Sequence, residues 1–336
     1  MGYYRYTTKK KKTLSDKTSV FITISVCLIC WITGYLNSVG FPLVKDSAVL
    51  PLWESLCNVL DNKVIAYVAG LFLMVLPVFV IQRINDVEML IRERTRLPFM
   101  IFILLASTNA GFIPLNEVSV VLICIVFMIY ELFNSYQLPE STGRFFNAGL
   151  LIGFAGLFMP QVLWYVPLLW IGMYQFRSIS YKSFFASLVG VLIVYWFVLA
   201  WCVWNHDFSI FASLYSSLTS VDIFSNSALL QYYRIGFALV VTLLITASFF
   251  IKMDAFNNSV RVRQMLSFLL NMSVWTLILL FLYSKSPDSF MAILYLPVSV
   301  VIAYFIENIR YRFRFVLYYS MLILLFAFYV IRIWIF

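Results

Sequence analysis

The sequence predicts an all-α, polytopic transmembrane helical bundle. Of its 336 residues, 63% are hydrophobic and 12% are charged, and the mean hydropathy is +0.92. A soluble domain carries about 25% charged residues, so this chain has too little polar surface to cover a water-soluble globule. Its apolar runs are separated by charge clusters, which indicates that lipid is the solvent for most of its side chains.

The apolar runs predict about eleven membrane spans, because a helix needs about 20 apolar residues to cross the hydrocarbon core. The runs 118–133 and 145–159 are short, so these two spans are expected to extend into flanking residues, to tilt or to break. The predicted spans are 19–38, 64–82, 97–113, 118–133, 145–159, 160–176, 183–205, 229–251, 265–284, 289–306 and 315–332.

The distribution of Lys and Arg tests these spans. With a cytoplasmic N-terminus, the inner segments hold 19 of the 24 Lys and Arg residues and the outer segments hold 5. The positive-inside rule depends on these residue types rather than on net charge. One missed span would invert every later loop and remove the asymmetry. The sequence therefore predicts a multi-pass protein of the cell inner membrane, with its N-terminus in the cytoplasm and its C-terminus outside.

The chain divides into three parts: a basic cytoplasmic tail over 1–18, a membrane module over 19–205 with a long outer loop at 39–63, and a second outer loop with C-terminal helices over 206–336. The tail and first span superficially resemble a signal peptide. They lack a small-x-small cleavage site, so the first span is expected to be retained.

The net charge of +9 would favour nucleic-acid binding in a soluble protein. Here the basic residues gather at the inner ends of the spans, so the lipid bilayer is the expected partner and nucleic acid is not. Cys27 and Cys30 form a C-x-x-C inside the first apolar run, with no second pair and no histidine nearby. They are interpreted as structural, and no metal site is predicted.

Small residues mark a packing face in the fifth predicted span. Gly149, Gly153 and Gly156 lie on one side of a helix at four- and three-residue spacing. Small residues let helix backbones approach closely in a membrane. The pattern favours packing within the chain over a dimer interface.

The outer loops carry the candidate site. A carboxylate above the membrane can deprotonate a hydroxyl or hold a divalent cation against a lipid diphosphate. Asp46 or Glu54 in the first loop is the candidate catalytic residue, and His206 and Arg234 are candidate phosphate-binding residues. Ordinary solvation is the alternative for each. Within the first loop, 50–60 alternates at roughly helical spacing, which predicts an amphipathic helix on the outer surface.

Other chemistry is disfavoured. The chain has no P-loop, no H-E-x-x-H and no G-x-S-x-G. Acidic residues are nearly absent from the predicted span interiors, where an ion-coupled transporter needs them.

Three segments carry a family resemblance over about 90–205: 96–101 (RLPFMI), 146–160 (FNAGLLIGFAGLFMP) and 177–185 (RSISYKSFF). Together they resemble an uncharacterised family of polytopic membrane proteins from Bacteroidota. That resemblance implies a membrane fold and carries no activity.

The order of elements has a more distant resemblance. A first span, a long outer loop, a helical hairpin and a G-x-x-x-G-x-x-G-x-F-x-P span resemble the module of GT-C type integral-membrane glycosyltransferases. The resemblance implies a GT-C-like arrangement of the first seven spans, a polyprenyl-phosphate-linked sugar as ligand, and an essential acidic residue in the first outer loop. Asp46 or Glu54 would occupy that place.

Three readings stay open, because the paired-acid pattern of that family (D-x-D or E-x-D) is absent from 39–63. The first is a GT-C-like glycosyltransferase, or a handler of polyprenyl-linked sugars, on the outer face of the cell envelope. The second is a non-catalytic scaffold or assembly partner in envelope biogenesis, with other membrane proteins as partners. The third and least favoured is a transporter of a lipid or solute.

Overall fold

The structure is a computed structural model. All secondary-structure elements in the part of the chain that it describes are helices. It describes residues 17–39, 41, 53, 57, 62–91, 95–109, 112–138, 140–206, 208–219, 227–253, 258–283, 287–309 and 311–335. The prediction of an all-α bundle is confirmed for these residues.

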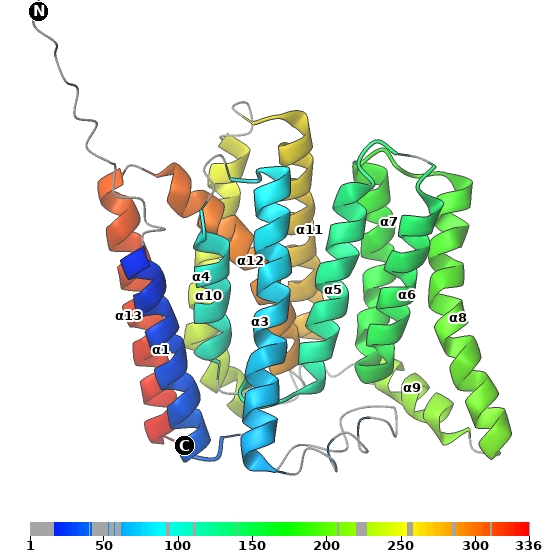
Figure 1. The fold of residues 1–336 in the computed structure, drawn as a ribbon, viewed down its shortest axis with the longest axis horizontal. Coiled ribbons are helices and arrows are strands. Elements are labelled where there is room, and N and C mark those ends of the chain that lie inside the picture. The colour runs from blue at the N-terminus through cyan, green and yellow to red at the C-terminus, as the bar shows by residue number, and fades with distance from the viewer. Residues whose placement is uncertain are drawn as a thin grey trace, which may run out of the picture.

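The helices run side by side and successive ones alternate in direction (Figure 1). The start of the first helix and the end of the last lie at opposite ends of the bundle. The elements are α1 (Lys17–Leu36), α3 (Lys63–Glu88), α4 (Leu97–Ser107), α5 (Glu117–Asn134), α6 (Thr142–Phe158), η2 (Pro160–Trp164), α7 (Tyr165–Gln175), α8 (Tyr181–Asn205), α9 (Ser209–Thr219), α10 (Ser227–Met253), α11 (Val260–Leu282), α12 (Pro287–Asn308) and α13 (Tyr311–Ile335).

Each of the eleven predicted spans falls on one of these helices. Within the described residues, seven helices are long and apolar enough to cross a membrane: α1, α3, α5, α8, α11, α12 and α13. Three shorter apolar helices cover Leu97–Ser107, Thr142–Phe158 and Val240–Ile251. The chain is therefore a multi-pass membrane protein by the length and composition of its helices, and a total of eleven crossings stays a prediction.

Helix length explains why α4 and α7 are not among the seven. At 1.5 Å per residue, the 11 residues of α4 span about 16 Å, roughly half of the hydrocarbon core. The 11-residue α7 has the same limit, because Pro160 ends the preceding helix and starts the 3-10 turn η2. Helices of this length can cross the membrane only together with the turns that flank them.

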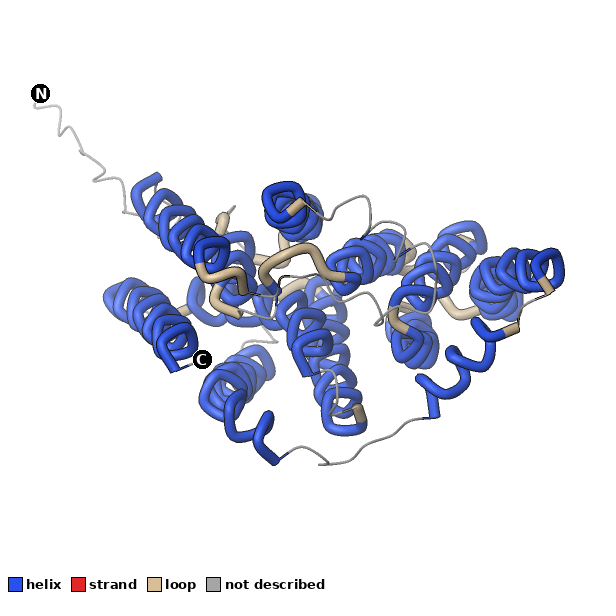
Figure 2. Tube along the Cα trace, turned by 90° about the horizontal axis from the view of Figure 1, so that it is seen from below, coloured by secondary structure: helices blue, strands red, loops and turns tan. Residues whose placement is uncertain are grey.

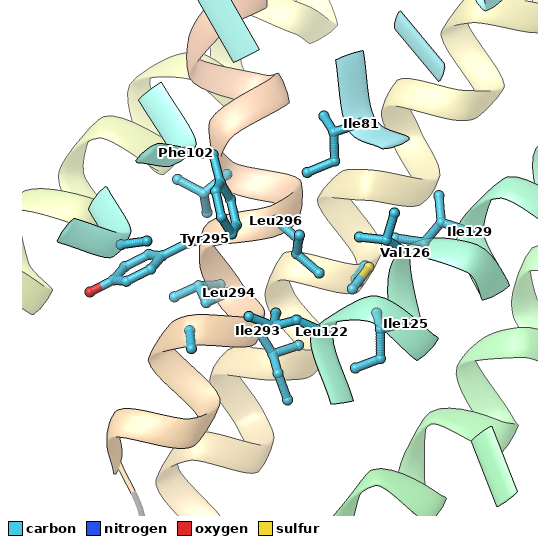
Figure 3. Close-up of a cluster of buried hydrophobic side chains, with 14 of the residues drawn as sticks. Ile81, Phe102, Leu122, Ile125, Val126, Ile129, Ile293, Leu294, Tyr295 and Leu296 are labelled. Atoms are coloured by element: carbon cyan, nitrogen blue, oxygen red, sulfur yellow. The ribbon is translucent and has the colours of Figure 1, made fainter. Parts of the chain in front are cut away.

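Helix α12 lies at the centre of the bundle. Of its most apolar 18-residue window, 89% is buried, whereas 22% of the corresponding window of α8 is buried. Figure 3 shows side chains of α12, among them Ile293 and Leu296, meeting Phe102 of α4, Ile81 of α3 and Val126 of α5. A helix that is apolar on all sides is typical of such a position.

The helices α6 and α8 form the most extensive helix pair, at the edge of the bundle (Figure 1). A Cβ atom on Gly153 would lie 3.1 Å from the carbonyl oxygen of Val191. On Gly149 it would overlap the carbonyl oxygen of Ser187, and on Gly190 that of Phe146. The predicted packing within the chain is confirmed, because Gly149 and Gly153 face α8 and Gly190 of α8 faces α6.

The first and last helices lie side by side and are joined by hydroxyl groups. Ser19 is 3.1 Å from the Tyr319 hydroxyl, and Thr33 is 2.9 Å from that of Tyr329. Tyr329 also donates to the carbonyl oxygen of Cys30. A buried hydroxyl without a partner is costly, so these bonds specify which helix pairs with α1.

The short helix α9 lies obliquely across the end of the bundle where α8 ends (Figures 1 and 2). Its Ile210 and Leu214 are buried, whereas Tyr215 is 71% exposed. Its last turn is held by Tyr283, whose hydroxyl donates to the carbonyl oxygen of Leu218 at 2.8 Å. Burial on one side only is typical of a helix that lies along a membrane interface.

Candidate functional site

Aromatic side chains join α1 and α3 at the end where α1 stops and α3 starts. The Trp31 indole donates to the carbonyl oxygen of Tyr67 at 3.1 Å. The Tyr67 hydroxyl donates in turn to the carbonyl oxygens of Val39 at 2.5 Å and Gly34 at 3.3 Å. The rings of Tyr35 and Tyr67 meet edge to face, with centroids 5.3 Å apart. These contacts fix the two helices at the end where α1 stops and α3 starts.

A groove of about 380 Å³ lies beside these contacts. Several of its residues are strongly exposed, with Val68 at 64%, Ile32 at 57% and Val64 at 52%. Both helices have the length and composition of membrane spans, so the groove opens sideways toward lipid. It is lined by Trp31, Ile32, Tyr35, Val64, Tyr67, Val68 and Leu71. We call it the α1–α3 groove.

One cation lies at the mouth of the α1–α3 groove. The Lys63 ammonium group lies 4.5 Å from the centre of the Tyr35 ring and donates to the Ser38 hydroxyl at 2.8 Å. The backbone that carries it is set by Asn62, whose side chain accepts a hydrogen bond from the amide of Val64 at 3.0 Å. The groove is therefore amphipathic, with apolar walls and a positive charge at one end.

Within the middle of the predicted first outer loop, the structure describes two positions. Trp53 and Cys57 are helical, and they are 2% and 1% exposed. Trp53 meets Phe158, at the end of α6, edge to face at 6.3 Å. Two buried residues four apart agree with the predicted amphipathic helix. The candidate catalytic residues Asp46 and Glu54 lie outside the described residues, so their roles stay predictions.

Of the two candidate phosphate-binding residues, the structure describes the side chain of His206. His206 ends α8 with a left-handed backbone (φ 52°), and its side chain is exposed. Helix α8 lies at the edge of the bundle opposite α1 (Figures 1 and 2), so the end of α8 that carries His206 is not part of the α1–α3 groove. Arg234 belongs to α10, and its side chain lies outside the described part of the chain.

No group of three or more His, Cys, Asp or Glu side chains within the described residues has the spacing of a metal site. Cys27 and Cys30 are both buried free cysteines of α1. Their predicted structural role agrees with this burial.

Reasoning from the sequence missed Lys63 and Tyr67 as parts of a site. Trp31 and Tyr35 are four residues apart at the end of the first span, and Tyr67 follows early in the next. This spacing places aromatic residues at one membrane interface, but it does not indicate that the two spans pack against each other. Only that pairing forms the groove.

A second, smaller cavity lies between α3, α5, α11 and α12. Its volume is about 20 Å³, close to that of one water molecule. Its walls are entirely apolar, including Ile84, Val126, Leu269 and Val300. An apolar cavity of this size is expected to stay dry and offers no route for a polar solute.

Comparison of this chain with protein-family models, with curated protein sequences and with solved structures found no match.

Proposed function

We propose that this integral membrane protein binds a polyprenyl-linked sugar from the outer leaflet, as a GT-C-like glycosyltransferase or as a handler of such lipids in the cell envelope. The observation that supports it is the α1–α3 groove. It opens sideways toward lipid, and its cationic mouth directly adjoins the first outer loop.

The shape of the groove and the position of Lys63 suit a lipid with a polar head. A hydrocarbon chain gains little by leaving one apolar environment for another, so binding within a membrane depends on packing and on polar contacts. A chain lying along Leu71, Val68 and Val64 would place its polar head beside Lys63. The loop that follows α1 is then the nearest source of a base or metal ligand, which is the role proposed for Asp46 or Glu54.

The catalytic part is tested by replacing three loop carboxylates together, Asp46→Ala, Glu54→Ala and Asp61→Ala. Loss of one or more envelope glycans at normal expression is expected. Unchanged glycans with a normally expressed variant would remove catalysis by this loop from the proposal.

The groove is tested separately with Val68→Trp, which fills it from the lipid side. Native mass spectrometry of the purified protein should show loss of a bound polyprenyl lipid. Phe72→Trp is the matched control, because Phe72 is 63% exposed on the same helix and does not line the groove. Equal lipid retention by both variants would contradict binding in the groove.

A non-catalytic scaffold is the second candidate. It is favoured by the missing paired-acid pattern and by the broad apolar surface of α8, where Trp196, Phe197, Trp201 and Trp204 are all exposed. Large exposed aromatic surfaces are typical of interfaces as well as of lipid contacts. Co-purification of a stoichiometric protein partner without bound lipid would support it over the first candidate.

Transport is the least supported reading. It needs a polar route near the membrane midplane, and the small cavity between α3 and α12 is apolar.

A further inference from the structure

The Lys63 ammonium group has two contacts among the described residues, and both are neutral: the Tyr35 ring and the Ser38 hydroxyl. Neither compensates its charge. Lys63 is half-buried against Tyr35 at the mouth of the α1–α3 groove. A cation held by neutral groups of the described residues, at the end of an apolar groove, is complementary to an amphiphile with a negative head.

We propose that the α1–α3 groove selects lipids with an anionic phosphate head, and that Lys63 is the residue that selects them. This inference rests on the proposed function, because it requires that the groove hold a lipid chain. Beyond the proposed function, it specifies the charge of the lipid head group and the residue that recognises this charge. It does not depend on catalysis by the first outer loop.

Geometry supports the pairing. Val64 and Val68 lie in the first turns of α3, directly after Lys63, so a chain packed on them has its polar end at the ammonium group. A charged hydrogen bond from ammonium to phosphate is roughly twice as strong as a bond between neutral groups. A phosphate can therefore replace the Ser38 hydroxyl as the acceptor. A lipid with a zwitterionic head offers less net charge.

The size of the preference follows from one cation at a membrane surface. A single Lys near the surface contributes enough to favour an anionic lipid by about fivefold. Salt weakens such an interaction as the Debye length shortens, which is about 8 Å at physiological ionic strength. The preference should therefore decrease in high salt, whereas packing of the chain should not.

The test uses the full-length protein in phosphatidylcholine nanodiscs. They are doped at equal mole fraction with a diazirine-bearing phosphatidic acid or a diazirine-bearing phosphatidylcholine. Photolabelled peptides over 64–71 are quantified by mass spectrometry. We expect about fivefold more labelling by the phosphatidic acid probe. Lys63→Gln should abolish this preference, and Lys63→Arg should retain it.

Two controls separate charge from structure. Ser38→Ala removes the hydroxyl tether but keeps the charge, so its preference should persist. Phe249, which is 66% exposed on α10, reports bulk lipid, and its labelling should be the same in every variant. A misfolded variant would change labelling at Phe249 as well.

The outcomes distinguish the two proposals. Equal labelling of 64–71 by both probes, or a preference that survives Lys63→Gln, overturns head-group selection and leaves lipid binding in place. Labelling of 64–71 no stronger than that of Phe249 with either probe overturns lipid binding in the groove itself.

Discussion

Gly149 of α6 lies directly against the backbone of Ser187 in α8, because a Cβ atom at position 149 would overlap the Ser187 carbonyl oxygen. The two backbones can come this close because glycine has no side chain. It places the edge helix α8, which is mostly exposed, at a fixed distance from the rest of the bundle.

Gly149→Ala should therefore push α8 away from α6. Overpacking of this kind costs about 1–3 kcal/mol, measurable as a lower Tm in detergent or nanodiscs. Gly143→Ala is the matched control on the same helix, because a Cβ atom at position 143 would meet no other atom within 4 Å. That control should be neutral or slightly stabilising. Equal Tm values for the two variants would contradict the close approach.

Tyr165 and Tyr195 both have a buried hydroxyl, and the two should respond differently to its removal. The Tyr165 hydroxyl is 2.9 Å from that of Thr276, so Tyr165→Phe should cost about 1 kcal/mol. The Tyr195 hydroxyl is buried and has no hydrogen-bond partner among the described residues. Tyr195→Phe should leave the Tm unchanged or raise it. A loss of stability in Tyr195→Phe equal to that in Tyr165→Phe would show that Tyr195 has a partner.

The ion pair between Glu307 and Arg314 joins the end of α12 to the start of α13. The Glu307 side chain is 5% exposed and that of Arg314 is 22% exposed. Arg314→Met leaves a buried carboxylate without its guanidinium, so a loss of about 3 kcal/mol is expected. The double variant Glu307→Gln with Arg314→Met should recover part of it. Additive losses in Tm across the set would mean that the two side chains act independently.

Tyr283 is expected to hold α9 on the bundle. Its hydroxyl accepts a hydrogen bond from the Trp164 indole at 2.8 Å and donates to the Leu218 carbonyl oxygen at 2.8 Å. Tyr283→Phe removes both bonds but keeps the ring stacked on Phe290. Hydrogen exchange over 209–219 should become several-fold faster, since about 1 kcal/mol corresponds to roughly fivefold. Unchanged exchange there, with α11 intact, would assign the anchoring of α9 to its buried Ile210 and Leu214.

The candidate site is predictable from the sequence only in part. The outer end of the first span and its aromatic residues Trp31 and Tyr35 are visible in the sequence, because interfaces favour such side chains. The role of Lys63 is not, because it appears in the sequence as one loop cation among several. The sequence predicts that His206 and Arg234 act with the first loop only because all three are expected on the same side of the membrane. A shared side does not bring residues together when whole helices separate them, and His206 lies across the bundle from α1 (Figure 1).

The sequence by itself determined the class of the protein and the places of its helices. Apolar length and the cost of charge in lipid act residue by residue, so each predicted span coincides with a helix. The tertiary arrangement adds that α1 packs against α4 and α13 and meets α3 at one end, that α12 is central, and that a groove with Lys63 at its mouth results. Those choices depend on shape and hydrogen bonding between segments far apart in the chain, such as Ser19 and Tyr319, and no local pattern encodes them.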